Sequence, residues 1–245
     1  MFSSLVQHDL ELNPQPDLAE SWGVSEDGKT YTFHLVRNAT FHDGKPVTSA
    51  DVKFTRGGDS LRSSWQSRLG RLDSIETPDE YTVVFKLKQP FSALIFMLDM
   101  GSGGPPILPK HLYEGTGIPN NPYNQKPIGS GPFKLVSWEK GNQIVLERNE
   151  NYFKKGLPYL DRIIMRIMAD QTALALAIEN GEIDYAPVGL SFSDAERLKE
   201  LENIDVVYSG REGLGVLLTL VMNLDNPISA NQKVMQSNSY PSMDC

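Results

Sequence analysis

The stretch LAESWGVSEDGKTYTFHL, residues 18–35, decides the fold of the first part of this 245-residue chain. Its last six residues alternate between polar and apolar side chains, which places Tyr31, Phe33 and Leu35 on one face of a β-strand. The Asp27-Gly28 pair ahead of that strand is a strong signal for a hairpin turn. The stretch therefore predicts a hairpin with one apolar face.

The sequence that follows continues this pattern of strands and turns. The run from His42 to Pro46 (HDGKP) predicts a second turn, and Thr48-Ser49-Ala50-Asp51 predicts the cap of a short helix that continues through Phe54. The run from Tyr81 to Leu87 (YTVVFKL), introduced by a turn at residues 77–80, predicts another strand. This half of the chain is therefore expected to be α+β with antiparallel strands.

Two segments rich in glycine and proline lie in the middle of the chain. Residues 101–106 (GSGGPP) end in two prolines, and residues 119–132 contain four prolines together with Gly129 and Gly131. Such composition is typical of loops and turns. The second segment is a candidate for the chain crossing between two domains.

Beyond residue 132, the pattern changes to strands that alternate with capped helices. Asp170 is the expected cap of one helix and Gly181 its C-terminal stop, while Ser193 and Glu196 form the capping box of a second helix. The expected strands are Phe133–Trp138 and Gln143–Arg148, joined as a hairpin around Lys140-Gly141-Asn142, then Ile163–Met168 and Ile183–Pro187, and the expected helices are Gln171–Asn180 and Ser193 to about Leu201. This alternation predicts an α/β character for the second half.

Composition and charge exclude several classes of protein. The chain has 23 Lys and Arg against 31 Asp and Glu, a net charge of −8, which argues against nucleic-acid binding because phosphate neutralisation needs clustered positive charge. Hydrophobic residues make up 40% of the chain, enough for a folded core. The single cysteine, Cys245, allows neither an intramolecular disulfide nor a cysteine metal cluster. No apolar stretch approaches the roughly 20 residues that span a bilayer.

No motif supports catalysis or phosphate binding. Pro105 and Pro106 follow the glycine run at residues 101–104, where a phosphate loop would open a helix. Gly129-Ser130-Gly131 lacks the spacing and the strand-to-helix turn of a nucleophile elbow. For His34 and His42 we expect a structural or surface role rather than metal ligation, because neither has a partner at metal-binding spacing. The pattern therefore favours binding over catalysis.

Six short motifs follow one another over residues 1 to about 225. They are LAESW with VSEDGKTYTFHL (residues 18–35), FHDGKPVTSADV (41–52), ILPKH (107–111), PIGSGPF (127–133), IVLERN with NYF (144–153) and GEID (181–184). In this order, they resemble family 5 of the extracellular solute-binding proteins, the peptide, dipeptide and nickel receptors of ABC importers. Each motif alone is weak, and the specificity comes from their order.

The resemblance implies a fold of mixed α+β and α/β class, periplasmic-binding-protein-like, in which two lobes close over a ligand like a Venus flytrap. It also implies that this chain is truncated at both ends and holds the first lobe with an inserted subdomain. The implied parts are a remnant of the first-lobe N-terminal segment (1–7), an inserted α+β subdomain (8–122), an incomplete main first-lobe α/β domain (123–226) and an atypical, disordered tail (227–245). Sheet edges left uncovered in such a fragment predict aggregation.

The implied function is that of the substrate-binding component of an ABC transporter. Such a protein captures a small solute, here expected to be a di- or oligopeptide, and delivers it to permease subunits. No enzymatic activity, cofactor, metal or nucleic-acid partner is expected. The resemblance implies a monomer in the periplasm or on the outer side of the membrane, which it meets through the permease or a lipid anchor missing from this sequence.

The resemblance also implies ligand-cleft residues, which lie on the two glycine-rich loops: Gly101, Ser102, Gly103, Gly129 and Ser130. Their backbone N–H groups would bind a ligand main chain without selecting its side chains. An alternative remains open, that these residues only form turns. Two other functions also remain open: a sensor or chaperone lobe without a permease, and a hydrolase using Ser130 or an acid pair.

Overall fold

The computed structural model describes residues 1–57, 71–101, 103–208, 225, 230, 231 and 233. Contacts group the chain into two units, residues 1–213 and residues 214–245. The first unit holds nearly all the described residues and is the one described below. The domain limits predicted after residues 7, 122 and 226 remain predictions, and most of the predicted tail lies outside the described residues.

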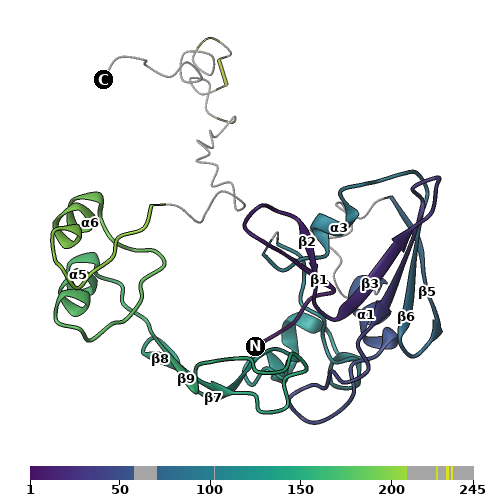
Figure 1. Ribbon diagram of the computed structural model, residues 1–245, viewed down its shortest axis with the longest axis horizontal. Coiled ribbons are helices and arrows are strands. Elements are labelled where there is room, and N and C mark those ends of the chain that lie inside the picture. The colour runs from purple at the N-terminus through teal and green to yellow at the C-terminus, as the bar shows by residue number, and fades with distance from the viewer. Residues whose placement is uncertain (58–70, 102, 209–224, 226–229, 232, 234–245) are drawn as a thin grey trace. The chain divides into compact units, whose positions relative to one another are not determined.

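The quoted stretch forms two adjacent strands, β3 at the edge and β4 beside it, of a four-stranded antiparallel sheet in the order β3-β4-β6-β5 (Figure 1). Its strands are β3 (Ala19–Val24), β4 (Thr30–Leu35), β5 (Leu72–Asp79) and β6 (Thr82–Leu87). In the turn between β3 and β4, Asp27 Oδ1 accepts a hydrogen bond from the Lys29 N–H at 3.1 Å, and Gly28 has a φ of +65°. That φ favours glycine, so the predicted hairpin is confirmed.

One face of this sheet carries the core of the first half of the chain. Tyr31, Phe33 and Leu35 are at most 3% exposed, which confirms the predicted apolar face. On the neighbouring strand, Phe85 packs edge-on against Phe33, with ring centroids 5.5 Å apart. Full burial of such side chains contributes about 1.5–3 kcal/mol each, so this cluster fixes the strand register.

Helix α1 (Ser49–Gly57) packs against β5 and β6. The Asp51 carboxylate caps its first turn by accepting hydrogen bonds from the N–H and Oγ1 of Thr48, both at 2.9 Å. The helix begins at Ser49, within the predicted cap, and extends to Gly57 rather than ending at Phe54. Strand β5 was not predicted, because only the turn at residues 77–80 was recognised there.

A second sheet follows the proline-rich segment, in the order β7-β8-β9 (Figure 1). Its strands are β7 (Phe133–Glu139), β8 (Gln143–Arg148) and β9 (Arg162–Arg166). The hairpin predicted around Gly141 is confirmed, and β9 ends two residues earlier than predicted. Every strand pair among the described residues is antiparallel, so this part of the second half is α+β rather than α/β.

Two helices follow the second sheet. Helix α5 (Gln171–Glu179) begins where predicted, with Asp170 Oδ1 accepting from the Ala173 N–H at 2.7 Å. Helix α6 (Phe192–Lys199) is capped by Ser191 rather than Ser193, because the overlapping Ser191 and Asp194 have the same capping-box spacing. The strand predicted at residues 183–187 is wrong: this segment is irregular in the structure, and Tyr185 is 79% exposed.

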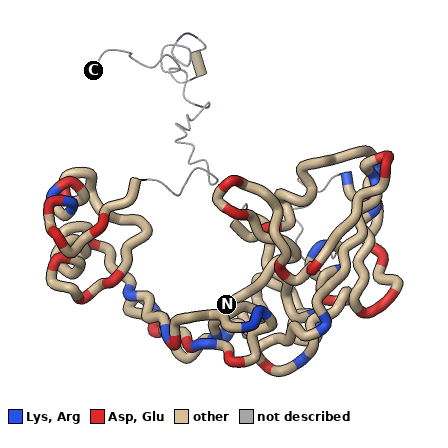
Figure 2. The backbone as a smooth tube through the Cα atoms, viewed as in Figure 1, with Lys and Arg blue, Asp and Glu red and all other residues tan. Residues whose placement is uncertain are grey.

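The remaining elements are short and connect these parts. Strands β1 (Val6–His8) and β2 (Pro14–Pro16) form a small antiparallel hairpin. Short helices occupy the middle of the chain: α3 (Leu94–Met97), α4 (Lys110–Tyr113) and the 3₁₀ turns η2 (Ile118–Asn120) and η3 (Pro122–Asn124). Basic and acidic residues are interspersed along the described chain (Figure 2).

Candidate ligand-binding site

The first predicted loop, residues 101–106, is organised by Asp99 just ahead of it, so that residues 99–104 form one turn, which we call the loop at residues 99–104. Its Oδ1 accepts a hydrogen bond from the Gly101 N–H at 3.0 Å, and its backbone oxygen accepts from the Gly104 N–H at 2.8 Å. Gly103 has a φ of +81°, a conformation that glycine adopts without strain. Gly101 and Gly103 are exposed, whereas Ser102 lies outside the described residues.

A buried histidine holds this loop against strand β1. His8 Nδ1 lies 2.9 Å from Asp99 Oδ2, and the two side chains are only 6% and 11% exposed. The ring of His8 also contacts that of Phe96, with centroids 5.0 Å apart. Hydrogen bonds of this kind are stronger when they are shielded from water, so the pair fixes the loop backbone.

The second predicted loop, residues 129–131, is held by His42 through three hydrogen bonds. The backbone N–H of His42 donates to the Gly129 oxygen at 2.8 Å. The ring accepts from the Gly129 N–H at Nδ1, at 3.2 Å, and donates from Nε2 to the Gly131 oxygen, at 3.1 Å. Burial lowers the pKa of His42, which favours the neutral ring that this arrangement needs. The structural role expected for this histidine agrees with these contacts.

The N-terminal residues pack directly onto the same loop. Met1 accepts a hydrogen bond from the Gly131 N–H at 2.8 Å, and Ser3 Oγ donates to the Ser130 oxygen at 3.3 Å. A Cβ atom added to Gly131 would lie 2.6 Å from the Met1 carbonyl carbon, and one added to Gly129 would overlap the Met1 oxygen. The glycines at these positions therefore allow the chain's own N-terminal backbone to approach.

Gly129, Ser130 and Gly131 are all buried in this structure. Ser130 is 1% exposed, and its Oγ has no hydrogen-bond partner among the described residues. A serine nucleophile needs an adjacent base, so these contacts do not support the hydrolase alternative. Among the described residues, no hydrogen bond joins this loop to the loop at residues 99–104, although each loop contacts the N-terminal segment at a different point.

Sequence reasoning did not identify the residues that hold these loops. His8 and Asp99 are 91 positions apart, and His42 is 87 positions from Gly129. Asn149 was also missed; its Nδ2 donates to the Gly131 oxygen at 3.1 Å. The available signal was the presence of His42, of residues 129–131 and of Asn149 in three of the six motifs.

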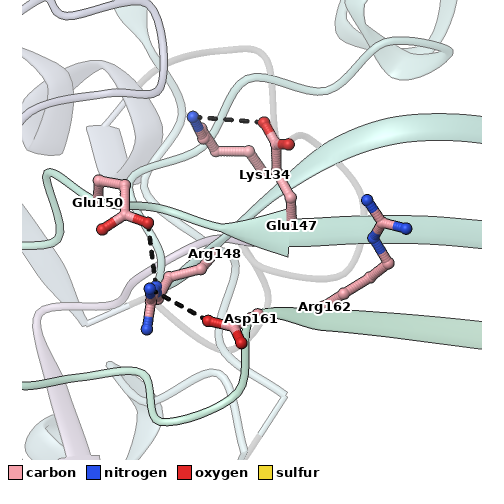
Figure 3. Close-up of a pocket in the computed structure, with 6 residues that line it drawn as sticks. All are labelled: Lys134, Glu147, Arg148, Glu150, Asp161 and Arg162. Atoms are coloured by element: carbon pink, nitrogen blue, oxygen red, sulfur yellow. Dashed lines mark hydrogen bonds and ion pairs between the residues drawn. The ribbon is translucent and has the colours of Figure 1, made fainter.

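A shallow charged pocket of about 420 Å³ lies on the β7-β8-β9 sheet (Figure 3). Arg148 contacts both Glu150 and Asp161 at 3.1 Å, and Lys134 Nζ lies 3.5 Å from Glu147 Oε1. Its lining comprises three basic and three acidic residues: Lys134, Arg148, Arg162, Glu147, Glu150 and Asp161. The opposite charges compensate one another, which is typical of a solvated surface network rather than of a ligand site.

In the described part of the chain, no group of three or more His, Cys, Asp or Glu side chains is placed to hold a metal ion. Within the same residues, no helix is both long and apolar enough to cross a membrane. His111 Nε2 instead pairs with the Asp43 carboxylate at 2.7 Å, and His34 is exposed.

Comparison with known proteins identifies relatives along most of the chain. The family model for bacterial extracellular solute-binding proteins, family 5 Middle, matches residues 13–237. A putative ABC transporter peptide-binding protein of Brucella ovis is 37% identical over 226 residues, covering 85% of this chain and 41% of the relative. The oligopeptide-binding protein AppA of Bacillus subtilis is 33% identical, covering 82% of this chain and 38% of the relative.

Solved structures give the same result. NikZ from Campylobacter jejuni, in complex with Ni(L-His), matches with a TM-score of 0.80 at 29% identity and covers 96% of this chain and 46% of its own. AppA from Bacillus subtilis, in complex with a nonapeptide, matches with a TM-score of 0.73 at 32% identity, covering 83% and 40%. The chain spans about two fifths of the length of the curated relatives it matches. With the family model matching more than half of its residues, the chain belongs to the family 5 bacterial extracellular solute-binding proteins.

Proposed function

We propose that this chain belongs to the substrate-binding component of an ABC transporter and that its ligand is a di- or oligopeptide. The observation that carries the proposal is the family match over residues 13–237, with relatives named as peptide-binding proteins over most of the same range. In this function, the protein captures the solute outside the cytoplasm and delivers it to the permease. It works as a monomer and performs no chemistry on its ligand.

The peptide is favoured over other solutes by the relatives' names. Besides AppA, the matches include a probable D,D-dipeptide-binding periplasmic protein of Escherichia coli, 35% identical over 198 residues. Other matching structures hold different ligands, such as agropinic acid in AgaA. The fold therefore accommodates several solutes, and the choice among them has to be measured.

The exposure of Gly101 and Gly103 supports a ligand contact at the loop of residues 99–104. The N–H groups of both glycines are bonded within the loop before any ligand binds, to Asp99 Oδ1 and to the Met100 oxygen. Preorganisation of this kind reduces the entropy that is lost on binding. We propose that this loop contacts the main chain of the peptide.

The proposal is tested by ligand titration of the ¹⁵N-labelled chain, followed by amide chemical shifts. A library of peptides of two to nine residues is compared with a nickel-histidine complex and with agropinic acid. We expect peptides alone to shift the amides of Gly101 and Gly103. Gly117, an exposed glycine in another loop, serves as the internal control.

A thermal-shift assay gives a second measurement. A ligand at about 100 times its Kd stabilises the folded state by about 2.7 kcal/mol, which raises the Tm of a domain of this size by roughly 5–10 °C. Stabilisation by the nickel complex or the opine, with none by any peptide, would contradict the peptide assignment.

A further inference from the structure

The ring of His42 is bonded at both of its nitrogens, and these bonds define its protonation state. The Gly129 N–H can only donate, so Nδ1 must accept and carries no hydrogen. The Gly131 oxygen can only accept, so Nε2 carries the hydrogen. Only the neutral ring with its hydrogen on Nε2 can make both bonds.

These bonds connect parts of the chain that no sheet connects. His42 lies in the turn after β4, whereas Gly129 and Gly131 directly precede β7. The contact spans 87 and 89 positions of sequence. The oxygen of Gly131 also accepts from Asn149, and the N–H of Gly131 donates to Met1. Gly131 therefore links the segments that contain His42, Asn149 and Met1.

Protonation of the ring removes one of these bonds. A second hydrogen on Nδ1 would point at the Gly129 N–H, so an attraction becomes a clash between two donors. Among the charged groups around the ring, the α-amino group of Met1 and Lys134 on β7 oppose protonation, and Asp43 favours it. Asp43 already pairs with His111 at 2.7 Å, and this limits how far its charge can stabilise a protonated His42 ring.

We propose that His42 is the positioning residue of the Gly129–Ser130–Gly131 segment, holding it through the neutral ring and losing its bond to the Gly129 N–H when the ring is protonated. This inference concerns the conformation of the chain and goes beyond the proposed function. The segment is one of the two loops predicted to line the ligand cleft, so the loss of this bond in acid would couple pH to the shape of that region. The ring is partly buried, which lowers the pKa of His42 and places the loss of the bond on the acidic side of the ordinary histidine range.

The experiment is nuclear magnetic resonance of the full 245-residue chain, labelled with ¹⁵N, without any ligand. Long-range ¹H–¹⁵N correlations report which ring nitrogen carries the hydrogen, and amide exchange reports the protection of Gly129 and Gly131. We expect the Nε2–H form at about pH 7.5. Between that pH and about pH 5, we expect protection of the Gly129 amide to fall at least about tenfold, after correction for the intrinsic exchange rate, as one hydrogen bond is lost.

Two variants separate titration from packing. His42→Asn keeps a side-chain acceptor near the position of Nδ1 but cannot titrate, so protection of Gly129 should become independent of pH. His34→Asn changes an exposed histidine on β4 and should behave as the unmodified chain does. If His42→Asn does not fold, the tautomer and the titration of the unmodified chain decide the question.

The proposal is overturned by an Nδ1–H tautomer at neutral pH, or by protection at Gly129 that stays constant while the ring titrates. It is also overturned if folded His42→Asn loses protection in acid as the unmodified chain does. Because no ligand is used, none of these outcomes depends on whether the protein binds peptides.

Discussion

Replacement of Gly131 by alanine tests whether the loop at residues 129–131 is glycine-rich because the N-terminal backbone approaches it. The added Cβ would lie 2.6 Å from the Met1 carbonyl carbon and 2.8 Å from both the Met1 oxygen and the Phe2 nitrogen. Contacts this close to backbone atoms cannot be relieved by rotating a side chain. The N-terminal segment must therefore move away from the loop in Gly131→Ala.

The expected cost follows from these contacts. Overpacking at a well-packed site costs about 1–3 kcal/mol, and loss of the hydrogen bond from the Gly131 N–H to Met1 costs about 1 kcal/mol. Alanine stiffens the unfolded chain, which offsets about 0.5 kcal/mol. We therefore expect Gly131→Ala to lower the free energy of unfolding by about 1.5–3.5 kcal/mol.

Equilibrium unfolding in guanidinium chloride, followed by far-UV circular dichroism, measures this difference. The matched control is Gly117→Ala, because Gly117 has a φ of −67° and nothing within 4 Å of its Cβ position. The control should change stability by no more than about 0.5 kcal/mol. If Gly131→Ala is as stable as Gly117→Ala, the N-terminal segment does not pack on this loop and the explanation for its glycines is wrong.

Three further substitutions test other contacts by the same unfolding measurement. Asp99→Ala removes the acceptor of both His8 and the Gly101 N–H in a nearly buried site; we expect a loss of about 1.5–3 kcal/mol and faster amide exchange at Gly101, and unchanged exchange would contradict its role in the loop. Asp170→Ala removes the cap of α5 and should cost about 1 kcal/mol, with fraying of the first helical turn; equal stability would mean that water replaces the cap. Arg148→Ala breaks two exposed ion pairs and should cost less than about 1 kcal/mol, an effect that high salt reduces; a larger, salt-independent loss would show that the charged pocket is structural.

Local patterns predicted those elements whose stability is set by nearby residues. The alternation of Tyr31, Phe33 and Leu35 and the turn at Gly28 were sufficient for the first hairpin, because turn geometry and burial act within a few positions. Asp170 was sufficient for the start of α5 for the same reason. Where two local signals overlapped, as at Ser191 and Ser193, the sequence could not tell which one caps the helix.

Contacts between distant residues could not be predicted from the same patterns. Strand β5 was missed because its apolar residue Ile75 stands among polar neighbours, and its pairing with β6 is what makes it a strand. The strand predicted at residues 183–187 is absent because this segment pairs with no other strand among the described residues. Its strand propensity alone is not sufficient to form one. The hydrogen bond between His42 and Gly129 joins a turn and a loop that come together only in the folded chain.

The two glycine-rich loops thus have glycine for different physical reasons, and this difference bears on where a ligand can bind. At residues 129–131, the chain's own N-terminal backbone occupies the space beside the glycines, and the N–H groups of Gly129 and Gly131 are already bonded. At residues 99–104, the N–H groups of Gly101 and Gly103 are also bonded, to Asp99 Oδ1 and to the Met100 oxygen, but both glycines are exposed. The atoms nearest to a Cβ on Gly101 belong to the side chain of Asp99, at 3.1 Å. A ligand main chain can approach the loop at residues 99–104 directly, but would have to displace Met1 to reach the loop at residues 129–131. Binding should therefore perturb Gly101 and Gly103 at lower ligand concentration than Gly129.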